Sequence, residues 1–459
     1  MDAEAELIIL GLRAEVERLR QEVARLTGRL EQAERVAARS AAPFRRRESK
    51  RVPPDQKKRP GRPDGHKGEH RVVPEHVDRH LDVPLQGCPT CGGAVDDVVA
   101  CEQFIEEIPP IRPHVTRLVT YQGRCSTCGD VASSHPMKMS EATGAAKVQL
   151  GSRAIALAAA LNKRFGCTLR TTCRILHDLA GLKVSPGGVA QALQRAGAKI
   201  EPAYDQLFAD LRGGAAVFAD ETSWYVGDPK WWLWAFTAAE TTAYVVDRER
   251  SSRVVTETLG AGFAGILVSD CLASYESLPY RKHKCIAHHL KAIAKARERP
   301  DTPDKTHLDQ WTLLFRAVIG YWRARPSMDE VEFVARRQGL ESWLDRLLGE
   351  PRTQPGDASI RKRIGKRRDE VLGCLYDPAA EPTNNRAERA LRPAVIARKL
   401  SCGNRTEAGK ACFEVLTSLA TTCVQRGHDF VAYLAESLPL LAQVVPVPPR
   451  LATTAAPAR

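Results

Sequence analysis

The sequence lacks the two features that would place a chain in or across a membrane. No stretch offers the ~18 uninterrupted apolar residues that a helix needs to span a bilayer. The first ten residues, MDAEAELIIL, are acidic and have no basic region before their short apolar run, so they do not resemble a secretory signal. We therefore expect a cytosolic chain with no membrane partner.

Negative charge is also in deficit. The chain has 68 Lys and Arg against 55 Asp and Glu, a net charge of +13. This excess predicts a polyanionic partner, of which nucleic acid is the leading candidate. With 459 residues the chain is too long for one compact core, and we expect several domains. Thirteen cysteines, an odd number, favour metal ligation or buried free thiols over a disulfide framework.

A heptad pattern of apolar side chains runs through residues 9–33. Mostly β-branched residues at its first position, with mostly Leu at its second and Glu and Arg on the flanks, favour a parallel two-stranded coiled coil over residues 5–37. The alternative is an amphipathic helix that packs on its own chain. The two seams are Ile9, Val16, Val23 and Leu30, and Leu12, Leu19, Leu26 and Ala33.

A segment rich in Arg, Lys, Pro and Gly follows. Residues 45–71 hold eleven Lys and Arg against four Asp and Glu. Such a segment cannot bury a core, so we expect an extended linker over residues 38–80 that can follow a phosphate backbone. Within KRPGRPDGHKG, Arg62 would enter a narrow minor groove, and Arg59 and Lys67 would be further DNA contacts. The alternative is a solvated linker without groove contacts.

Two CxxC pairs, each followed by glycine, lie in residues 81–135. Four thiolates on two tight turns make the ligand set of a closed structural zinc site, and they predict a zinc ribbon with a strand-like stretch between the pairs. Free thiols are the alternative. We expect Cys101, between the pairs, to be a buried apolar residue. The predicted ligands are Cys88, Cys91, Cys125 and Cys128.

Residues 145–205 have the pattern of short helices separated by turns. The predicted helices cover about 149–164 and 169–180, and a third starts where the N-cap Ser185 precedes Pro186 at the first helical position. This order resembles a helix-turn-helix DNA-binding domain with the segment from Pro186 as recognition helix. A small helical linker domain is the alternative.

From Ala215 the periodicity changes to that of strands. AAVFAD predicts a buried strand that ends in Asp220, WWLWAF and TTAYVVD predict two more, and GILVSD predicts a strand that ends in Asp270. Two strands that end in aspartate would bring both carboxylates to a shared site. An aspartate at a strand end is also a common turn former or helix cap.

A third carboxylate, Glu388, lies in EPTNNRAERALRP. Together with Asp220 and Asp270 it would hold two Mg²⁺ ions about 3.5–4 Å apart, with Mn²⁺ as an alternative, for an in-line phosphoryl displacement. Read alone, Glu388 is a salt-bridged acid on an exposed helix. The neighbouring basic residues would face the phosphates of a bound strand. These residues are Arg386, Arg389, Arg392, Arg398 and Lys399.

The order of these motifs resembles the insertion sequence 66 family of transposases. The resemblance covers about residues 5–430 and rests on GRPDGHKG, CxxC…CxxC, FADET, VSD, CIAHHLKA and NNRAERALRPAVIARK. It implies a ribonuclease H-like core with Asp220, Asp270 and Glu388 as catalytic metal ligands. It also implies motif positions at Asn385, Arg389, Arg398 and Lys399.

By this resemblance the chain would be an enzyme, a DNA transposase of a bacterial insertion sequence. It would bind the terminal inverted repeats of its element, free a 3′-hydroxyl by hydrolysis and join it to target DNA. The implied partners are double-stranded DNA, further copies in a homodimer or synaptic assembly, and accessory proteins of the same element, in the nucleoid-associated cytoplasm. Two other functions stay open: a zinc-containing DNA-binding regulator with an inactive core, and a ribonuclease H-like nuclease without strand transfer.

Other residues near these motifs have open roles. His288 of CIAHH is a candidate group near the scissile phosphate. A metal site at Cys285, His288 and His289 would need further ligands that the sequence does not identify, so packing at a helix start is favoured. Glu221 should point away from Asp220 and be structural. Core packing is expected, with base stacking as the alternative, for Trp224, Trp231, Trp232 and Trp234.

The predicted fold is a multidomain α+β architecture. Its parts are a dimerising coiled coil (5–37), a basic linker (38–80), a zinc ribbon (81–135), a helical DNA-binding domain (145–205), the first part of a ribonuclease H-like α/β core (213–300), a helical insertion (301–376), the second part of the core with C-terminal helices (377–440) and a disordered tail (441–459).

Overall fold

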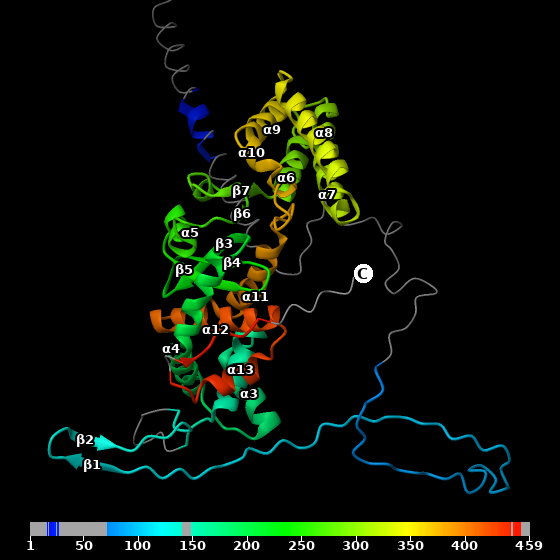
Figure 1. Ribbon diagram of the computed structural model, residues 1–459, viewed down its shortest axis with the longest axis vertical. Helices are drawn as coiled ribbons and strands as arrows, with labels where there is room; N and C mark the ends of the chain where they lie inside the picture. The colour runs from blue at the N-terminus through cyan, green and yellow to red at the C-terminus, as the bar shows by residue number, and fades with distance from the viewer. Residues whose placement is uncertain are drawn as a thin grey trace, which may run out of the picture. The chain divides into compact units, whose positions relative to one another are not determined.

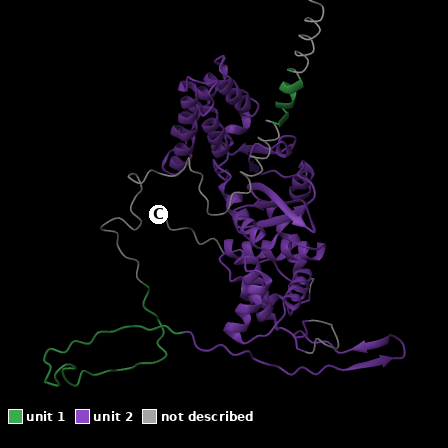
Figure 2. Cartoon of the chain, turned by 180° about the vertical axis from the view of Figure 1, so that it is seen from behind, with its two compact units in different colours: residues 1–107 green, residues 108–459 purple. Residues whose placement is uncertain are grey.

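The computed structural model describes residues 16, 18–23, 25–26, 71–139, 148–441 and 444–450. The chain forms two units, residues 1–107 and residues 108–459, which Figure 2 shows in different colours. Figure 1 labels the helices and strands. None of the helices in these described ranges combines the length and the apolar character that a membrane crossing requires.

In the first unit, the residues described between 16 and 26 are helical. The predicted seam side chains among them are exposed, as expected for a face that a second helix would cover, but self-association stays a prediction. The seam residues concerned are Val16, Leu19, Val23 and Leu26. The rest of the predicted coiled coil and the predicted DNA contacts Arg59, Arg62 and Lys67 lie outside the described residues.

The hairpin of β1 (Gln122–Cys125) and β2 (Gly129–Ala132) is antiparallel and closes at Cys125 and Gly129. The prediction of a strand-like stretch between the two CxxC pairs is wrong for residues 94–121, which form no strand. Apolar side chains there, such as Ile105, remain exposed because no neighbouring strand pairs with the segment. Cys101 is likewise exposed rather than buried.

The helices predicted after residue 148 are confirmed. They are α2 (Ser152–Ala159) with the π-helical turn η3 (Ala160–Arg164), α3 (Leu169–Ala180) and α4 (Pro186–Arg212). Ser185 caps α4 as expected, since its Oγ accepts a hydrogen bond from the Gly188 N–H at 3.0 Å. The chain turns after α3 at Gly181, whose φ of 65° suits a residue without a side chain.

These helices share a core with the C-terminal helices α12 (Glu407–Gln425) and α13 (Phe430–Ser437). Ile200 and Leu207 of α4 are fully buried against Leu416 and Leu419 of α12. This core joins helices that precede the central sheet in the sequence to helices that follow it, although the residues lie about 200 positions apart.

The sheet of the second unit has the strand order β5-β4-β3-β6-β7. Its strands are β3 (Ala216–Val226), β4 (Asp228–Thr237), β5 (Thr242–Asp247), β6 (Ile266–Ser269) and β7 (Arg281–Lys284). The first three form an antiparallel meander, whereas β6 runs parallel to β3 and β7 runs parallel to β6. The sheet is therefore mixed, and the unit is an α+β structure.

β3 does not end at Asp220, as the sequence pattern predicted, but continues to Val226. The extension has a partner, since Thr222 pairs with Leu233 and Trp224 pairs with Trp231 of β4. The polar residues of ADETS (219–223) lie in the middle of the strand, because pairing with β4 satisfies their backbone groups.

The two faces of β3 pack differently. Ala216 and Phe218 lie in a core that includes residues of the helices after β7, and Trp224 and Val226 lie in a core with Leu391 and Phe413. The alternate residues Val217 and Ala219 pack on the opposite face, with α4 and α5 (Ser252–Leu259). Trp224, Trp231 and Trp234 are buried, which confirms their expected role in core packing, and Trp232 is partly buried.

Helices surround the carboxyl ends of β6 and β7. In chain order they are α6 (Ile286–Arg297), α7 (Thr306–Ala324), α8 (Glu330–Gly349), α9 (Pro355–Gly365), α10 (Arg368–Val371) and α11 (Asn385–Ser401). The expected helical content between residues 302 and 375 is thus present. Ala387, in the first turn of α11, returns to the core beside Ala216 and Phe218 of β3.

Candidate active site

Asp220 lies on β3 between two apolar clusters of the same sheet face. Phe218 precedes it by two positions and Trp224 follows it by four, so all three side chains share this face. Asp220 is only partly exposed. The strand therefore holds this carboxyl group between buried apolar side chains.

Asp270 follows directly on β6, the strand that neighbours β3. Its Oδ1 accepts a hydrogen bond from the Leu272 N–H at 2.8 Å, which turns the chain away from the sheet. Asp270 can form this turn and also bind a metal ion, because its second carboxylate oxygen remains for another partner.

Glu388 lies in the first turn of α11, where its N–H bonds the Asn384 carbonyl at 3.1 Å. Asn384 is fully buried and donates from its side-chain amide to the Ala219 carbonyl at 2.8 Å, one residue before Asp220. This bond fixes the start of α11 against β3, although Glu388 comes 118 positions after Asp270 in the sequence.

The electrostatics of Asp220 depend on Asp270 and Glu388, which lie near enough for their charges to act on it. Burial, and then the negative charges of Glu221, Asp270 and Glu388, raise the pKa of Asp220 to about 8. Like charges held together at the end of a core are costly unless a cation compensates them. The ligand oxygens of the three carboxylates do not all lie within 4.8 Å of one another in this structure, so their joint role as metal ligands stays a prediction.

Glu221 is structural, as predicted. Its side chain points to the opposite face of β3, where Oε1 accepts from Arg250 at 2.6 Å and Oε2 accepts from the Tyr275 hydroxyl at 2.6 Å. The Arg250 guanidinium in turn stacks on the Trp232 ring, 4.4 Å from its centroid. Burial raises the pKa of Glu221, opposed by these two hydrogen bonds.

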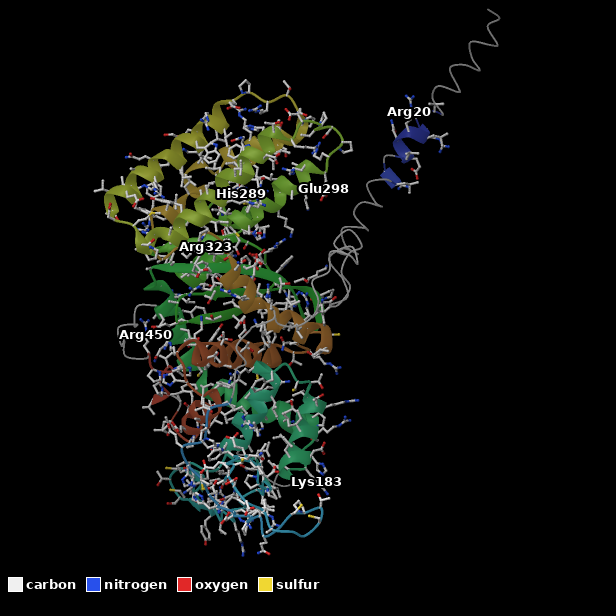
Figure 3. The ribbon with its side chains drawn as sticks, turned by 90° about the vertical axis from the view of Figure 1, so that its right-hand side faces the viewer. Arg20, Lys183, His289, Glu298, Arg323 and Arg450 are labelled. Carbon is white, nitrogen blue, oxygen red and sulfur yellow. The ribbon has the colours of Figure 1, made fainter. Side chains whose placement is uncertain are left out.

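The CIAHH motif starts α6 next to these carboxylates. Cys285 is the N-cap, fully buried, and His288 Nε2 lies 4.0 Å from Glu388 Oε1. His289 is buried against Phe315, with ring centroids 5.4 Å apart, and Figure 3 shows it among the green and yellow helices. Burial, and then the charge of Arg363, lower the pKa of His289 to about 3, so it is a neutral packing residue.

The basic residues of α11 divide into two groups. Arg386 is held by Glu381 at 2.6 Å and by the Ala238 carbonyl at 3.1 Å, and Arg398 binds Thr222 and Ser223 of β3. Both cations are used within the fold. The other predicted DNA contacts on this helix are exposed, and they are Asn385, Arg389, Arg392 and Lys399.

The structure adds cations that the sequence pattern did not indicate. Lys284 of β7 is fully buried and donates to the Ser269 hydroxyl at 3.1 Å, one residue before Asp270. Arg367 bonds the Cys271 carbonyl at 3.5 Å, one residue after Asp270. One turn earlier, the Arg363 Nε is buried and has no hydrogen-bond partner among the described residues. The sequence pattern did not distinguish these three residues from the solvated lysines and arginines of the chain.

Each CxxC pair forms a tight turn. The Cys88 N–H bonds the Gly93 carbonyl at 2.8 Å, and the following glycine of each motif has a positive φ. Hydrogen bonds from the backbone of Thr90 and Cys91 lower the pKa of Cys88, and those of Cys128 and Thr127 lower the pKa of Cys125. Both turns thus suit thiolate ligands. The two pairs belong to different units, so the four-cysteine site stays a prediction.

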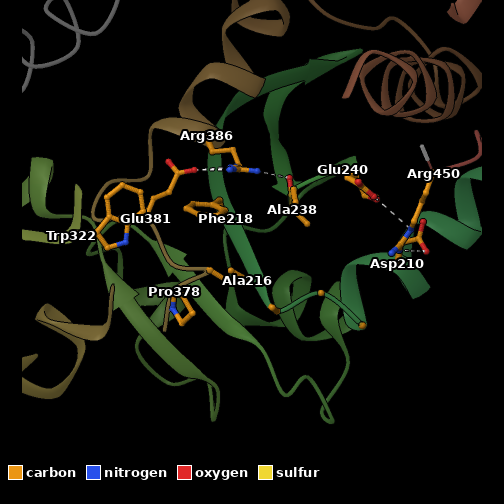
Figure 4. Close-up of a pocket in the computed structure, with 16 residues that line it drawn as sticks. Asp210, Ala216, Phe218, Ala238, Glu240, Trp322, Pro378, Glu381, Arg386 and Arg450 are labelled. Carbon is orange, nitrogen blue, oxygen red and sulfur yellow. Dashed lines mark hydrogen bonds and ion pairs between the residues drawn. The ribbon is translucent and has the colours of Figure 1, made fainter. Parts of the chain in front are cut away.

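A cavity of about 490 Å³ lies at the other end of β3 (Figure 4). Its charged side chains are paired, since Glu381 lies 2.6 Å from Arg386, and Arg450 lies 3.0 Å from Asp210 and 3.9 Å from Glu240. None of the three converging carboxylates lines it. The cavity is therefore distinct from the candidate active site.

Comparison with known proteins identifies the family. A family model described as Transposase IS66 family matches residues 147–411, more than half of the chain and the whole span from Asp220 to Glu388. Two uncharacterised proteins of Sinorhizobium fredii (strain NBRC 101917 / NGR234) are similar over most of their length. Protein y4qI is 25% identical over 410 residues, which cover 80% of this chain and 73% of that relative. Protein y4jD is 22% identical over 400 residues, which cover 80% of this chain and 77% of that relative. With the family match spanning its sheet, its helical insertion and all three carboxylates, the chain belongs to the IS66 family of transposases.

Proposed function

We propose that this transposase cuts DNA at the ends of its element and joins the freed 3′ ends to target DNA, with two divalent ions held by Asp220, Asp270 and Glu388. The observation that supports the proposal is the raised pKa of Asp220, about 8, to which burial and then the charges of Glu221, Asp270 and Glu388 contribute. Asp220 of β3, Asp270 directly after β6 and Glu388 of α11 offer the oxygen ligands that Mg²⁺ prefers.

The residues present fit such ions. Each carboxylate has at least one oxygen without a hydrogen-bond partner among the described residues, and bound cations would offset the repulsion between their charges. Bound Mg²⁺ would supply activation of the attacking oxygen and stabilisation of the leaving oxygen. The chain itself contributes the rigid frame, because β3 and β6 are paired and Asn384 attaches α11 to β3.

The sheet supports a ribonuclease H-like core. An antiparallel meander of three strands is followed by two parallel strands on the side of β3, and the first aspartate lies on the central strand. We infer that α7 to α10 form an insertion in this core between the second and third carboxylates. Helix α6, which precedes this insertion, packs on the core, since Ile286 and Ile293 lie in the same hydrophobic cluster as Phe218.

The proposed DNA surface includes the exposed side of α11. Arg389 and Arg392 have no acidic partner among the described residues, and they follow Glu388 by one and four positions. Phosphate contacts at these positions would align a strand with the carboxylates. Arg386 and Arg398 are left out of this surface because their guanidinium groups already bind protein groups.

Other modules would hold and organise the DNA. We propose that zinc bound by the two CxxC turns stabilises a ribbon, that the N-terminal helix mediates a homodimer, and that the helices from α2 to α4 contribute to recognition of the element ends. On α4, Val189 and Leu193 are buried, so only its outer face and the exposed Arg170 and Arg174 of α3 are open to a groove or backbone.

The test is cleavage and strand transfer on labelled DNA that carries the element's own end, with Mg²⁺. Glu388→Gln removes one charge at nearly constant volume, and it should abolish both steps while the affinity for DNA stays within about twofold. Glu407→Gln is the matched control, since Glu407 is an exposed acid in the first turn of the neighbouring helix α12.

The outcomes separate the candidate functions. If Glu388→Gln joins DNA as fast as the wild type, the catalytic assignment is wrong. If the wild type cuts but never joins a pre-cut end, the protein is a nuclease without strand transfer. If both proteins bind the end tightly and neither cuts, a DNA-binding regulator is the better description.

A further inference from the structure

A second set of ligands lies against Glu388. The Cys285 thiol, the His288 ring and the Glu388 carboxylate each offer one atom, and these atoms lie within 4.8 Å of one another. The Cys-x-x-His spacing places Cys285 at the N-cap of α6 and His288 in its first turn, on the same side of the helix. The ligand missing from the sequence pattern is the glutamate of α11, about 100 residues further along the chain.

The two helix starts are attached to each other by their backbones. The Ile286 N–H donates to the Pro382 carbonyl at 2.9 Å, and the Asn384 N–H donates to Cys285 Sγ at 3.1 Å. An N–H donor to sulfur stabilises a thiolate, as it does around metal-bound cysteines. Burial raises the pKa of the Cys285 thiol and the Asn384 N–H opposes this, so a bound cation would compensate the charge of a buried thiolate.

We propose that Cys285, His288 and Glu388 bind a thiophilic divalent cation such as Zn²⁺. Sulfur, imidazole and carboxylate together are a zinc ligand set, and three protein ligands leave a fourth position for water. Mg²⁺ does not select sulfur or nitrogen. Cys285 binds as the thiolate, and its proton passes to solvent.

The distances suit this ion after a small adjustment. Zinc bonds of about 2.0–2.3 Å in a tetrahedron place neighbouring ligand atoms ~3.5 Å apart. His288 and Glu388 lie 4.0 Å apart, and their side chains are 30% and 36% exposed, so rotation about their side-chain bonds can close the gap. Cys285 is the fixed ligand, because it is fully buried.

Unsatisfied polar atoms mark the same place. The Nδ1 atom of His288 and the Oδ1 atom of Asn384 are buried without a hydrogen-bond partner among the described residues. Buried polar groups are nearly always paired, so these two atoms indicate a bound water, while the nitrogen that faces Glu388 and would hold the cation is Nε2. This observation is independent of the ligand spacing.

Occupation of this site has a consequence for catalysis that rests on the proposed function. Glu388 would serve both the thiophilic cation and the Mg²⁺ set with Asp220 and Asp270. A zinc ion held by Cys285 and His288 draws the carboxylate toward α6. The site is thereby an inhibitory one, through which zinc stops cleavage and joining without displacing bound DNA.

Co²⁺ absorbance tests the site without DNA. A sulfur-to-cobalt charge-transfer band requires a thiolate ligand, and the difference between wild type and Cys285→Ser isolates this thiol from the CxxC cysteines. We expect Cys285→Ser and His288→Ala to weaken Co²⁺ and Zn²⁺ binding at this site more than ~100-fold, beyond the 10–100-fold typical of outer-shell changes. Cys271→Ser is the matched control, because Cys271 lies beside His289, with 3.7 Å between Sγ and Nε2, and is outside the set.

A band that persists unchanged in Cys285→Ser, or that disappears only in Cys271→Ser, overturns the proposal. If Cys285→Ser does not fold, retention of the full affinity by His288→Ala overturns it instead. Zinc inhibition is then measured in each variant relative to its own rate with Mg²⁺ alone, and Cys285→Ser should resist it. Loss of the band in Cys285→Ser, together with full loss of activity in Asp220→Asn, supports both proposals. A Cys285-dependent band in a protein that never cuts DNA supports the zinc site and refutes the catalytic function.

Discussion

Acidification should weaken Mg²⁺ binding because the Asp220 carboxyl must lose a proton before it can bind a cation. Burial and the neighbouring carboxylates raise its pKa to about 8, so about a tenth of the molecules carry an ionised Asp220 at pH 7. Metal binding therefore competes with one proton. Below pH 8 the apparent dissociation constant for the first Mg²⁺ should rise about tenfold for each pH unit, and above about pH 9 it should be constant.

The same proton affects the stability of the metal-free protein, with a definite sign. The folded-state pKa of Asp220 lies above its usual value of 3.8, so between pH 4 and pH 8 the folded protein holds a proton that the unfolded chain has lost. Stability therefore falls as the pH rises through this window. At ~1.4 kcal/mol for each pH unit, the cost at pH 7 is at most ~4 kcal/mol. Asp220→Asn should remove this cost and raise the melting temperature at pH 7 but not at pH 4.

Calorimetric titration of Mg²⁺ in two buffers of different ionisation enthalpy measures the proton directly. We expect the wild type to release about 0.9 proton for the first ion at pH 7, and almost none at pH 9. Asp228→Asn is the control, because Asp228 lies partly exposed on β4, where the backbone N–H of Lys230 lowers its pKa. This variant should behave as the wild type.

Mg²⁺ binding that is independent of pH between 6 and 9 would refute the reasoning, as would equal proton release by the wild type and Asp220→Asn. Either result would mean that Asp220 is ionised in the metal-free protein, and hence that the carboxylates do not lie close enough to repel one another.

Three further variants test other contacts. Arg363→Gln should lower cleavage of the element end more than ~10-fold at an unchanged melting temperature, because the guanidinium of this half-buried side chain keeps an Nε without a hydrogen-bond partner among the described residues and suits a DNA phosphate, whereas the exposed neighbour Lys362→Ala should cleave normally. Tyr275→Phe should lower the free energy of unfolding by about 1–2 kcal/mol in urea titrations, since it leaves one oxygen of the buried Glu221 without a donor. Arg426→Ala should cost about 3–5 kcal/mol in the same assay, because its 2.5 Å ion pair with an acid of α4 is buried, and a loss below 1 kcal/mol would show that water replaces the guanidinium.

Local patterns predicted the elements well where a few neighbouring residues decide the conformation. Ser185 before Pro186 predicted the start of α4, and the glycines after both CxxC pairs predicted turns, since caps and turns depend on bonds across three or four positions. The apolar stretch that ends at Asp270 likewise predicted β6. The end of β3 was wrong, because the pairing of Trp224 with β4 sets the length of that strand.

The direction of long side chains could not be predicted. Arg386, Arg389 and Arg392 have the same chemistry and lie on one helix, yet the packing of α11 turns the first toward Glu381 and leaves the other two exposed. The sequence pattern treats the three alike because it has no information on which face of the helix meets the sheet. Arg398 was assigned to DNA for the same reason, although it binds the β3 backbone at Ser223.

The sequence by itself determined the ligand types and the local turns: two aspartates near strands, a glutamate at a helix start, and cysteine pairs with the spacing of a metal site. Tertiary structure decided which of these groups meet. The bond from buried Asn384 to Ala219 holds the start of α11 beside β3, and Glu388 lies with Cys285 and His288. Neither placement follows from spacing along the chain, because Glu388 comes 168 positions after Asp220 and 103 positions after Cys285, and the packing of α11 against β3 and α6 closes that distance.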